Sequence, residues 1–291
     1  MSWGAAEGTS VEVEAGVRLH VAATGPAGGQ RPPVVLLAGL GLDHESWAGP
    51  AAALAGRGHR VIGVDLRGTG RSDAPTGGYT LDRLAADVAA VLDRLDLAAT
   101  VLVGHSFGAQ VALLLAATAP GRLSGLALVS SNGVRASRSA GFPFGADPDR
   151  LERALVRAEL ADRTAARCQN VRAGFPAGAE PDPGLVDRLV AWQLRMPPWA
   201  AVACLRTYLH ADLTAALAAV KLPVLQILGR HDPVTAVDGG PWVQDRLADG
   251  RLVVLDCGHY PMFELPGPLA ARLSEFAAGA GDGDGGSYGR M

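Results

Sequence analysis

The pentapeptide Gly104-His105-Ser106-Phe107-Gly108 decides how the rest of the chain is interpreted. An apolar run at residues 100–103 precedes it and is typical of a buried strand, and residues 109–117 after it are typical of a helix. A serine between two glycines at a strand-to-helix turn is the nucleophile-elbow pattern. The glycines remove side chains that would clash in so tight a turn. The alternative is a loop that contains a serine by chance, which the two flanking elements disfavour.

The composition of the chain excludes several classes of function. The 291 residues include 26 basic and 29 acidic side chains, giving a formal net charge of −3, and 48% of the residues are hydrophobic. This charge favours neither a nucleic acid nor an anionic membrane as partner. No apolar run reaches the roughly 18 residues of a membrane span. We therefore expect a protein with a sizeable core whose partner is a small molecule; composition does not bear on its oligomeric state.

The cysteines and the two termini carry no sign of export or metal binding. Cys168, Cys204 and Cys257 are too few for a disulfide framework and lack metal-ligand spacing, so no metal site is expected. Residues 1–9 contain no basic segment leading into an apolar core, so no signal peptide is expected. We expect a cytoplasmic protein with reduced thiols. The Gly- and Asp-rich residues 279–291 are expected to be disordered.

Apolar runs that each end in a polar loop recur along the chain, with helical patterns between them. An alternating pattern over residues 11–21 predicts an antiparallel hairpin at a sheet edge. Strand and helix units in alternation predict a mostly parallel sheet covered by helices on both faces. Ligands of such sheets bind beyond the carboxyl ends of the strands. The predicted strand ends are Leu37, Val64, Val103, Val129, Leu228 and Leu255.

The pattern changes after Ser131, where helical segments replace the alternation until about residue 213. An insertion at the carboxyl end of a strand would form a roof over Ser106. Helices are expected there at 148–168, 183–194 and 199–209. The predicted organisation is an α/β core from residues 10–131 and 213–278, a helical cap over 132–212 and the tail at 279–291.

Large side chains in the predicted cap are candidates for contact with a substrate. Phe142, Trp192 and Trp199 would give an aromatic, apolar pocket, although packing is the commoner role of such side chains. Arg172 or Arg195 would suit a substrate carboxylate, although a solvated surface position is the commoner one for arginine.

Two further residues complete a candidate constellation with the serine. A serine hydroxyl is a poor nucleophile at neutral pH and needs an adjacent base, which in turn needs an orienting group. Asp232 follows the strand that ends at Leu228, and His259 follows the strand that ends at Leu255. Both are therefore expected at the sheet edge where Ser106 lies. The order Ser, Asp, His along the chain is the one expected of a nucleophile elbow in such a sheet.

Each member of this constellation has an alternative interpretation. An Asp before a Pro is usually a turn former, and a lone histidine in a loop is usually only polar. Asp256 or His231, which lie close by in sequence, could instead be the functional neighbour. Three loops at one edge that supply a nucleophile, an acid and a base in the right order favour the constellation over chance.

The oxyanion of an acyl-transfer intermediate needs preorganised backbone donors. The expected donors are the N–H of Phe107 and the N–H of Leu40, in a loop that Gly39 and Gly41 allow to approach closely. The alternatives for this loop are a plain turn or a phosphate cradle. The cradle is disfavoured because neither G-x-x-x-x-G-K-[ST] nor G-x-G-x-x-G occurs.

Taken together, these motifs resemble the α/β-hydrolase fold superfamily, in particular its capped branch of cofactor-free haloperoxidase-like esterases, lactonases and C–C bond hydrolases. The resemblance implies the α/β-hydrolase fold, with a central sheet, a helical lid and no cofactor. One departure is Ala38-Gly39, where the family usually has His-Gly at the start of the oxyanion loop. The 67–72 segment is expected to brace loops. The matching stretches are residues 34–47, 65–73, 104–108, 229–234 and 258–266.

The constellation and the resemblance predict a serine hydrolase for an ester, lactone or thioester of a small to medium, hydrophobic substrate. The same residues would serve a C–C bond hydrolase, or an acyltransferase or cyclase. A hydrolase fold retained as a non-catalytic ligand-binding protein is the alternative from a different class. Epoxide hydrolases and dehalogenases are disfavoured, because they resemble this fold but carry Asp where this chain has Ser106.

Overall fold

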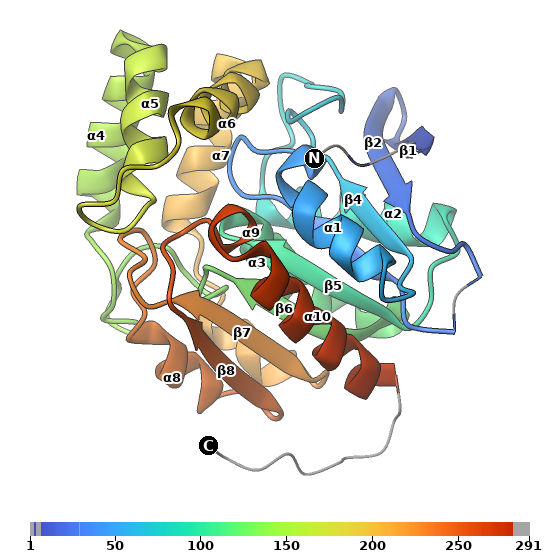
Figure 1. Cartoon of the computed structure of the whole chain (residues 1–291). Helices are drawn as coiled ribbons and strands as arrows, with labels where there is room; N and C mark the ends of the chain where they lie inside the picture. The colour runs from blue at the N-terminus through green and yellow to red at the C-terminus, as the bar shows by residue number, and fades with distance from the viewer. Residues whose placement is uncertain (1–2, 4–6, 29, 282–291) are drawn as a thin grey trace.

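The computed structural model describes residues 3, 7–28 and 30–281 and contains an eight-stranded sheet in the order β1-β2-β4-β3-β5-β6-β7-β8 (Figure 1). β1 pairs antiparallel with β2, and β2 pairs antiparallel with β4, whereas β3 to β8 run parallel. The predicted edge hairpin and mostly parallel sheet are thereby confirmed. The strands are β1 Glu7–Glu14, β2 Val17–Thr24, β3 Val34–Leu37, β4 Val61–Val64, β5 Thr100–His105, β6 Leu123–Val129, β7 Val224–Gly229 and β8 Gly250–Leu255.

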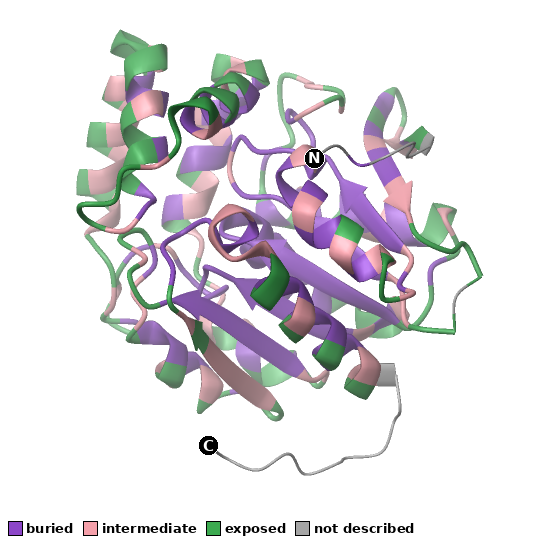
Figure 2. Cartoon of the chain, in the orientation of Figure 1, coloured by how far each residue is buried: buried purple, intermediate pink, exposed green. Residues whose placement is uncertain are grey.

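Helices cover both faces of the sheet and enclose two clusters of buried apolar side chains. Helices α1 and α10 lie together on the face turned toward the viewer in Figure 1, and α2 and α3 lie on the opposite face. The β3 to β7 strands between them are buried throughout (Figure 2), apart from one half-buried residue in β6. The helices of the core are α1 Ala48–Ala55, α2 Leu81–Arg94, α3 Phe107–Thr118, α8 Gly239–Gln244, α9 Pro261–Glu264 and α10 Pro266–Gly281. Short 3-10 turns lie at η1 His44–Trp47, η2 Pro120–Arg122 and η3 Thr214–Ala219.

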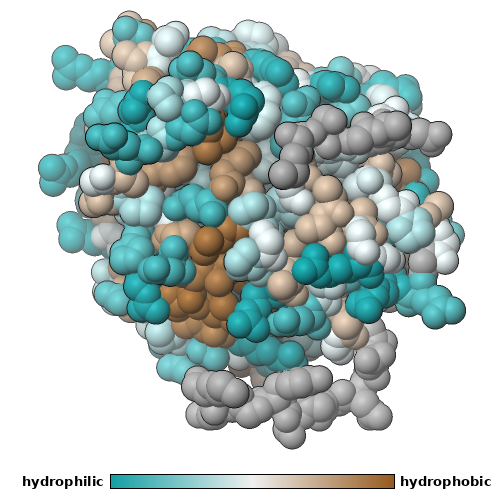
Figure 3. Space-filling model, in the orientation of Figure 1, coloured by the Kyte–Doolittle hydropathy of each residue, from teal (hydrophilic) through white to brown (hydrophobic). Residues whose placement is uncertain are grey.

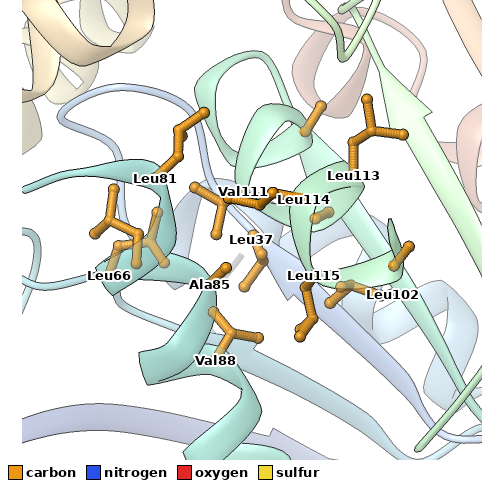
Figure 4. Close-up of a cluster of buried hydrophobic side chains, with 14 of the residues drawn as sticks. Leu37, Leu66, Leu81, Ala85, Val88, Leu102, Val111, Leu113, Leu114 and Leu115 are labelled. Carbon is orange, nitrogen blue, oxygen red and sulfur yellow. The ribbon is translucent and has the colours of Figure 1, made fainter. Parts of the chain in front are cut away.

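Helix α2 shows how the sequence pattern produces this packing. The Thr80 side chain accepts a hydrogen bond from the N–H of Arg83 and caps the first turn. Apolar residues at helical spacing, including Ala85 and Val88, then form one buried stripe. That stripe packs against Leu115 and other residues of α3 and against the side chains of the sheet (Figure 4).

A helical insertion lies between β6 and β7 and overhangs the carboxyl ends of the strands, at the upper left of Figure 1. The insertion itself was predicted, while its limits at 132 and 212 stay a prediction. The expected helix at 148–168 is two helices, because the Asp162 backbone is extended and its carboxylate caps the second helix through the N–H of Ala165. The cap helices are α4 Pro148–Ala161, α5 Arg163–Ala173, α6 Pro183–Arg195 and α7 Pro198–His210.

The C-terminal helix is longer than expected, and the edge strand β8 is less buried than the strands inside the sheet. Helix α10 continues to Gly281, so the first three residues of the tail predicted at 279–291 are helical; Ala280 packs against the core at Gly125. Residues 282–291 lie outside the described part. Strand β8 at the sheet edge is mostly half-buried, and apolar side chains gather on the surface over it (Figure 3). No helix in the described ranges is long and apolar enough to cross a membrane.

Asp87 on α2 forms a buried ion pair with Arg67, whose side chain is 1% exposed. The Arg67 guanidinium donates to both Asp87 carboxylate oxygens, at 2.6 and 2.8 Å. Replacing Asp87 by alanine is expected to lower the free energy of unfolding by about 3–5 kcal/mol, because a buried guanidinium loses its main counter-charge. Urea denaturation measures this loss. Asp93→Ala, which breaks a surface pair with Arg122, is the control and should cost much less, because solvent screens exposed charges. Equal losses in the two variants would contradict the prediction.

Candidate active site

Ser106 lies at a sharp turn between β5 and α3 with φ 51° and ψ −115°. This backbone conformation is rare for a residue with a side chain and costs about 1–3 kcal/mol. The flanking glycines are required by space: a Cβ on Gly104 would lie 2.4 Å from the Gly108 oxygen, and one on Gly108 would lie 2.6 Å from the Ala38 oxygen. The turn is held by the bond from the Ser106 N–H to the Val129 carbonyl, 2.9 Å.

The structure brings the three predicted residues Ser106, Asp232 and His259 into one hydrogen-bonded series. His259 Nε2 lies 3.1 Å from Ser106 Oγ, and His259 Nδ1 lies 2.8 Å from Asp232 Oδ2. Burial alone would raise the pKa of Asp232, but His259 and the N–H groups of Thr235 and Val234 outweigh burial and lower the pKa. An ionised Asp232 accepts the Nδ1 proton, which leaves Nε2 free to accept the Ser106 hydroxyl proton.

The backbone around His259 is fixed by one carboxylate and by the cap. Glu264 accepts hydrogen bonds from the N–H of Gly258 at 2.8 Å and of Tyr260 at 3.0 Å, on either side of the histidine. The His259 N–H donates to the carbonyl of Gly174, just past the end of α5, at 2.8 Å. The position of the imidazole therefore depends on both the core and the cap.

His105 holds the same loop from the nucleophile side, a contact that sequence analysis missed. Its Nε2 donates to the His259 carbonyl at 2.9 Å, while its Nδ1 has no hydrogen-bond partner among the described residues. Burial, reinforced by the nearby His259, lowers the pKa of His105 to about 3, so the ring is neutral. Its place inside the pentapeptide was the one signal in the sequence.

Asp256 and His231, the alternative partners left open by the sequence, lie away from this series. His231 Nε2 is 2.9 Å from Asp256 Oδ1, and the two side chains are 52% and 81% exposed. Both point outward as a surface pair, and neither lines the cavity at Ser106. They therefore serve as controls for their neighbours Asp232 and His259.

A cavity of about 650 Å³ opens above Ser106, His259 and Asp232. All four cap helices contribute to its roof, as expected for an insertion at this edge of the sheet. Its size is within the range of small-molecule sites, roughly 300–1,000 Å³. The cap residues that line it include Leu151 and Leu155 of α4, Arg167 of α5, Gln193 of α6 and Tyr208 of α7.

The loop predicted to carry an oxyanion donor packs against the elbow. A Cβ on Gly39 would lie 3.2 Å from the Ser106 Cβ, and Leu40 lines the cavity. Neither the Leu40 N–H nor the Phe107 N–H donates to an acceptor in the described part of the chain. Ala38, where the family usually has His, is 3% exposed and packs in the core. Assignment of the two N–H groups as oxyanion donors stays a prediction.

The three aromatic side chains expected to contact a substrate do not line this cavity. Phe142 is 1% exposed and packs edge-on against Phe144 and Trp242. Trp192 stacks on Phe263, in the wall of a different cavity. Trp199 is 51% exposed, and its indole N–H donates to the Pro75 carbonyl at 3.2 Å. Packing is thus the observed role of Phe142 and Trp192.

Tyr208 is the cap aromatic that faces the nucleophile instead. Its ring lies edge-on to Phe107, with centroids 6.0 Å apart, and it lines the cavity beside Ser106. Burial raises the pKa of Tyr208 to about 12, while the nearby Ser106 hydroxyl acts in the opposite direction. The phenol therefore stays protonated at neutral pH and can donate a hydrogen bond inside the cavity.

One cluster of potential metal ligands lies outside this cavity, at His20, His44 and Asp65, with candidate atoms within 4.8 Å of one another. Asp65 is already engaged: Oδ1 accepts from the His44 N–H and lies 2.9 Å from its Nδ1, and Oδ2 accepts from the Arg71 N–H. The cluster thus joins two loops, which is the bracing role expected of the 67–72 segment. No metal is assigned to it.

Comparison with known proteins gives one family and several relatives. A family model described as alpha/beta hydrolase fold matches residues 32–266. The non-heme chloroperoxidase of Streptomyces lividans is 34% identical over 230 residues, covering 76% of this chain and 82% of the relative. A 3-oxoadipate enol-lactonase of Acinetobacter baylyi is 28% identical and covers 86% and 89%. An esterase from Exiguobacterium antarcticum superposes with a TM-score of 0.87 over 93% of this chain and 99% of its own, at 24% identity, which speaks for the fold alone.

Proposed function

The chain belongs to the alpha/beta hydrolase fold family, and we propose that it is a serine hydrolase that cleaves an ester, lactone or thioester of a small molecule. The observation that carries this proposal is the hydrogen-bonded series Ser106–His259–Asp232 at the floor of a cavity roofed by the cap. The same series would also serve C–C bond cleavage or transfer of an acyl group to an alcohol, and no contact in the site favours either of these over hydrolysis.

In this proposal Ser106 Oγ attacks the substrate carbonyl while His259 Nε2 takes its proton. Asp232 holds the imidazole in the required tautomer and stabilises the imidazolium that forms. The Leu40 and Phe107 N–H groups, neither of which has an acceptor among the described residues, would hold the oxyanion. His259 then donates its proton to the leaving group, and a water activated by His259 releases the acyl group from Ser106.

The lining of the cavity agrees with an ester that has an apolar portion. Leu151, Leu155 and Leu205 of the cap contribute apolar surface beside polar side chains of both the core and the cap. The two relatives are named for different reactions, one as a chloroperoxidase and one as an enol-lactonase. Their similarity therefore supports the hydrolase class, and the substrate has to be inferred from the residues of the site.

Labelling by a fluorophosphonate tests the proposal without knowledge of the substrate. The reagent is expected to form one adduct on Ser106, located by peptide mass spectrometry, because only an activated serine attacks phosphorus at a useful rate. Ser106→Ala should abolish the adduct. Ser131→Ala is the matched control, because Ser131 is also 6% exposed and also follows a strand at this sheet edge, yet should leave labelling unchanged.

Two results would count against the proposal. A folded protein that gives no adduct would favour a ligand-binding protein that keeps the hydrolase fold. An adduct that persists in Ser106→Ala would place the reactive group elsewhere. After specific labelling, product analysis with esters, lactones, thioesters and β-diketones separates hydrolysis from C–C cleavage and acyl transfer.

A further inference from the structure

The cap contains a cluster of three charges that the proposed reaction leaves unused, two of them buried and the third, Arg163, 21% exposed. The Glu159 carboxylate of α4 lies between two arginines of α5, 2.7 Å from Arg163 Nε and 2.9 Å from Arg167 Nε. The side chains of Glu159 and Arg167 are only 4% and 7% exposed. Two cations share one anion, so one positive charge is in excess. A buried charge without its own counter-ion is unfavourable, which points to a missing anion.

The two arginines differ in how their remaining N–H groups are satisfied. Arg163 also donates to the backbone carbonyls of Gln193 and Met196. Arg167 makes a long contact, 3.5 Å, with the Gln193 side-chain oxygen, and its Nε is not aligned for a hydrogen bond with Glu159. No other hydrogen bond leaves the Arg167 guanidinium within the described ranges. The donors without a close acceptor therefore belong to Arg167.

Arg167 lines the same cavity as Ser106 and His259, whereas Arg163 does not. Its charge also reaches the phenol of Tyr260, the residue after His259: burial raises the pKa of Tyr260, and Arg167 opposes that rise. The described carboxylates lining the cavity are Asp232, which is bonded to His259, and the exposed Asp238. Neither forms an ion pair with Arg167, and Glu159, which does, is not among the residues that line the cavity.

We propose that Arg167 binds a carboxylate of the substrate, so that the substrate class is an ester, lactone or thioester that also carries a free carboxylate. The planar guanidinium presents parallel N–H donors that match the two oxygens of a carboxylate. The reacting carbonyl lies at Ser106, the carboxylate at Arg167, and the apolar chain between them against leucines such as Leu151 and Leu155. This inference rests on the proposed hydrolase function.

The test compares acidic and neutral esters of matched length. The p-nitrophenyl monoesters of succinate, glutarate and adipate are paired with p-nitrophenyl butanoate, pentanoate and hexanoate, and the rate without enzyme is subtracted. We expect one acidic ester to have a kcat/KM at least about 10-fold above that of its neutral pair. Arg167→Met should lower kcat/KM for that acidic ester by about 10- to 100-fold, mainly through KM, and leave the neutral ester nearly unchanged.

Arg195→Met is the matched control, because Arg195 is a cap arginine that pairs with Asp43 and does not line the cavity. It should change neither ester. Equal kcat/KM values for acidic and neutral esters in the wild-type enzyme, or equal losses for both in Arg167→Met, would overturn the inference and leave Arg167 a structural role.

A second measurement needs no variant and covers the case in which Arg167→Met fails to fold. Glutarate or adipate should inhibit hydrolysis of p-nitrophenyl butanoate competitively at constant ionic strength, and the corresponding diamide should not. Equal inhibition by both would overturn the inference. Fluorophosphonate labelling of the same preparation separates the two proposals. If no adduct forms on Ser106, the hydrolase proposal fails. If Ser106 is labelled but neither the acidic esters nor the dicarboxylates are preferred, only the proposed role of Arg167 fails.

Discussion

Replacement of His259 by alanine is expected to lower kcat for p-nitrophenyl butanoate by roughly 10⁴- to 10⁶-fold. Among the described residues, the imidazole is the base that lies 3.1 Å from Ser106 Oγ, and it must later protonate the leaving group. Its loss removes both steps. The variant should stay folded, because the loop that carries it is held by its own backbone and by Glu264. Circular dichroism and the thermal midpoint check this.

The control for this prediction is His231→Ala, which removes the exposed histidine nearby in the structure and should leave kcat within about 2-fold of the wild type. A double variant gives a sharper criterion. Residues that act as one unit are strongly non-additive, so Ser106→Ala/His259→Ala should be no slower than the slower single variant. Additive losses would mean that the serine and the histidine act in separate steps, contrary to the proposed mechanism.

Much of this arrangement could be predicted from the sequence because the signals are local. An apolar run or a glycine pattern can be recognised within a few residues of sequence. In a parallel sheet the carboxyl ends of the strands lie at the same edge. Ser106 follows its strand directly, and Asp232 and His259 lie in the short loops after theirs, so the topology brings them together. The 2.8 and 3.1 Å contacts between them then follow from loops of only a few residues.

The cap was harder to predict because its side chains are oriented by packing between helices. Helical periodicity identifies a buried face but does not say whether that face meets the core or a cavity. Trp192 and Phe142 were therefore misplaced, whereas Tyr208 and Arg167, at the cavity, carry no motif at all. Arg167 is distinguished from the other described arginines by its place in the lining of the cavity, and that place depends on how α4 and α5 pack.

The charge state of Asp232 sets how the site responds to acid. Because its pKa is lowered in the folded protein, the stabilisation from its ionised form is fully present above the unfolded-state value of about 4. That stabilisation is lost only as the pH falls through the lower folded-state value. We therefore expect Asp232 to stay ionised between pH 5 and pH 9, so that any change of rate in this range has another cause.

Asp232→Asn is accordingly expected to lower kcat by roughly 10⁴-fold at neutral pH, with little change in KM. Asp232 Oδ1 accepts from the N–H groups of Val234 and Thr235, and Oδ2 accepts from His259. An asparagine must keep its oxygen toward the two N–H donors, so its NH₂ group faces His259 Nδ1. Nδ1 then becomes the acceptor and Nε2 carries the proton.

A histidine in that tautomer has no lone pair for the Ser106 hydroxyl, so the base is present but wrongly protonated. Asp256→Asn provides the control, since Asp256 is 81% exposed and pairs with His231 outside the cavity; it should leave kcat within about 2-fold. If Asp232→Asn lost less than about 10-fold, the tautomer would not depend on Asp232 and this acid would be structural. Asp232→Asn changes which His259 nitrogen carries the proton and keeps the shape of the site. It therefore tests the role of Asp232 in setting the tautomer more cleanly than Asp232→Ala would.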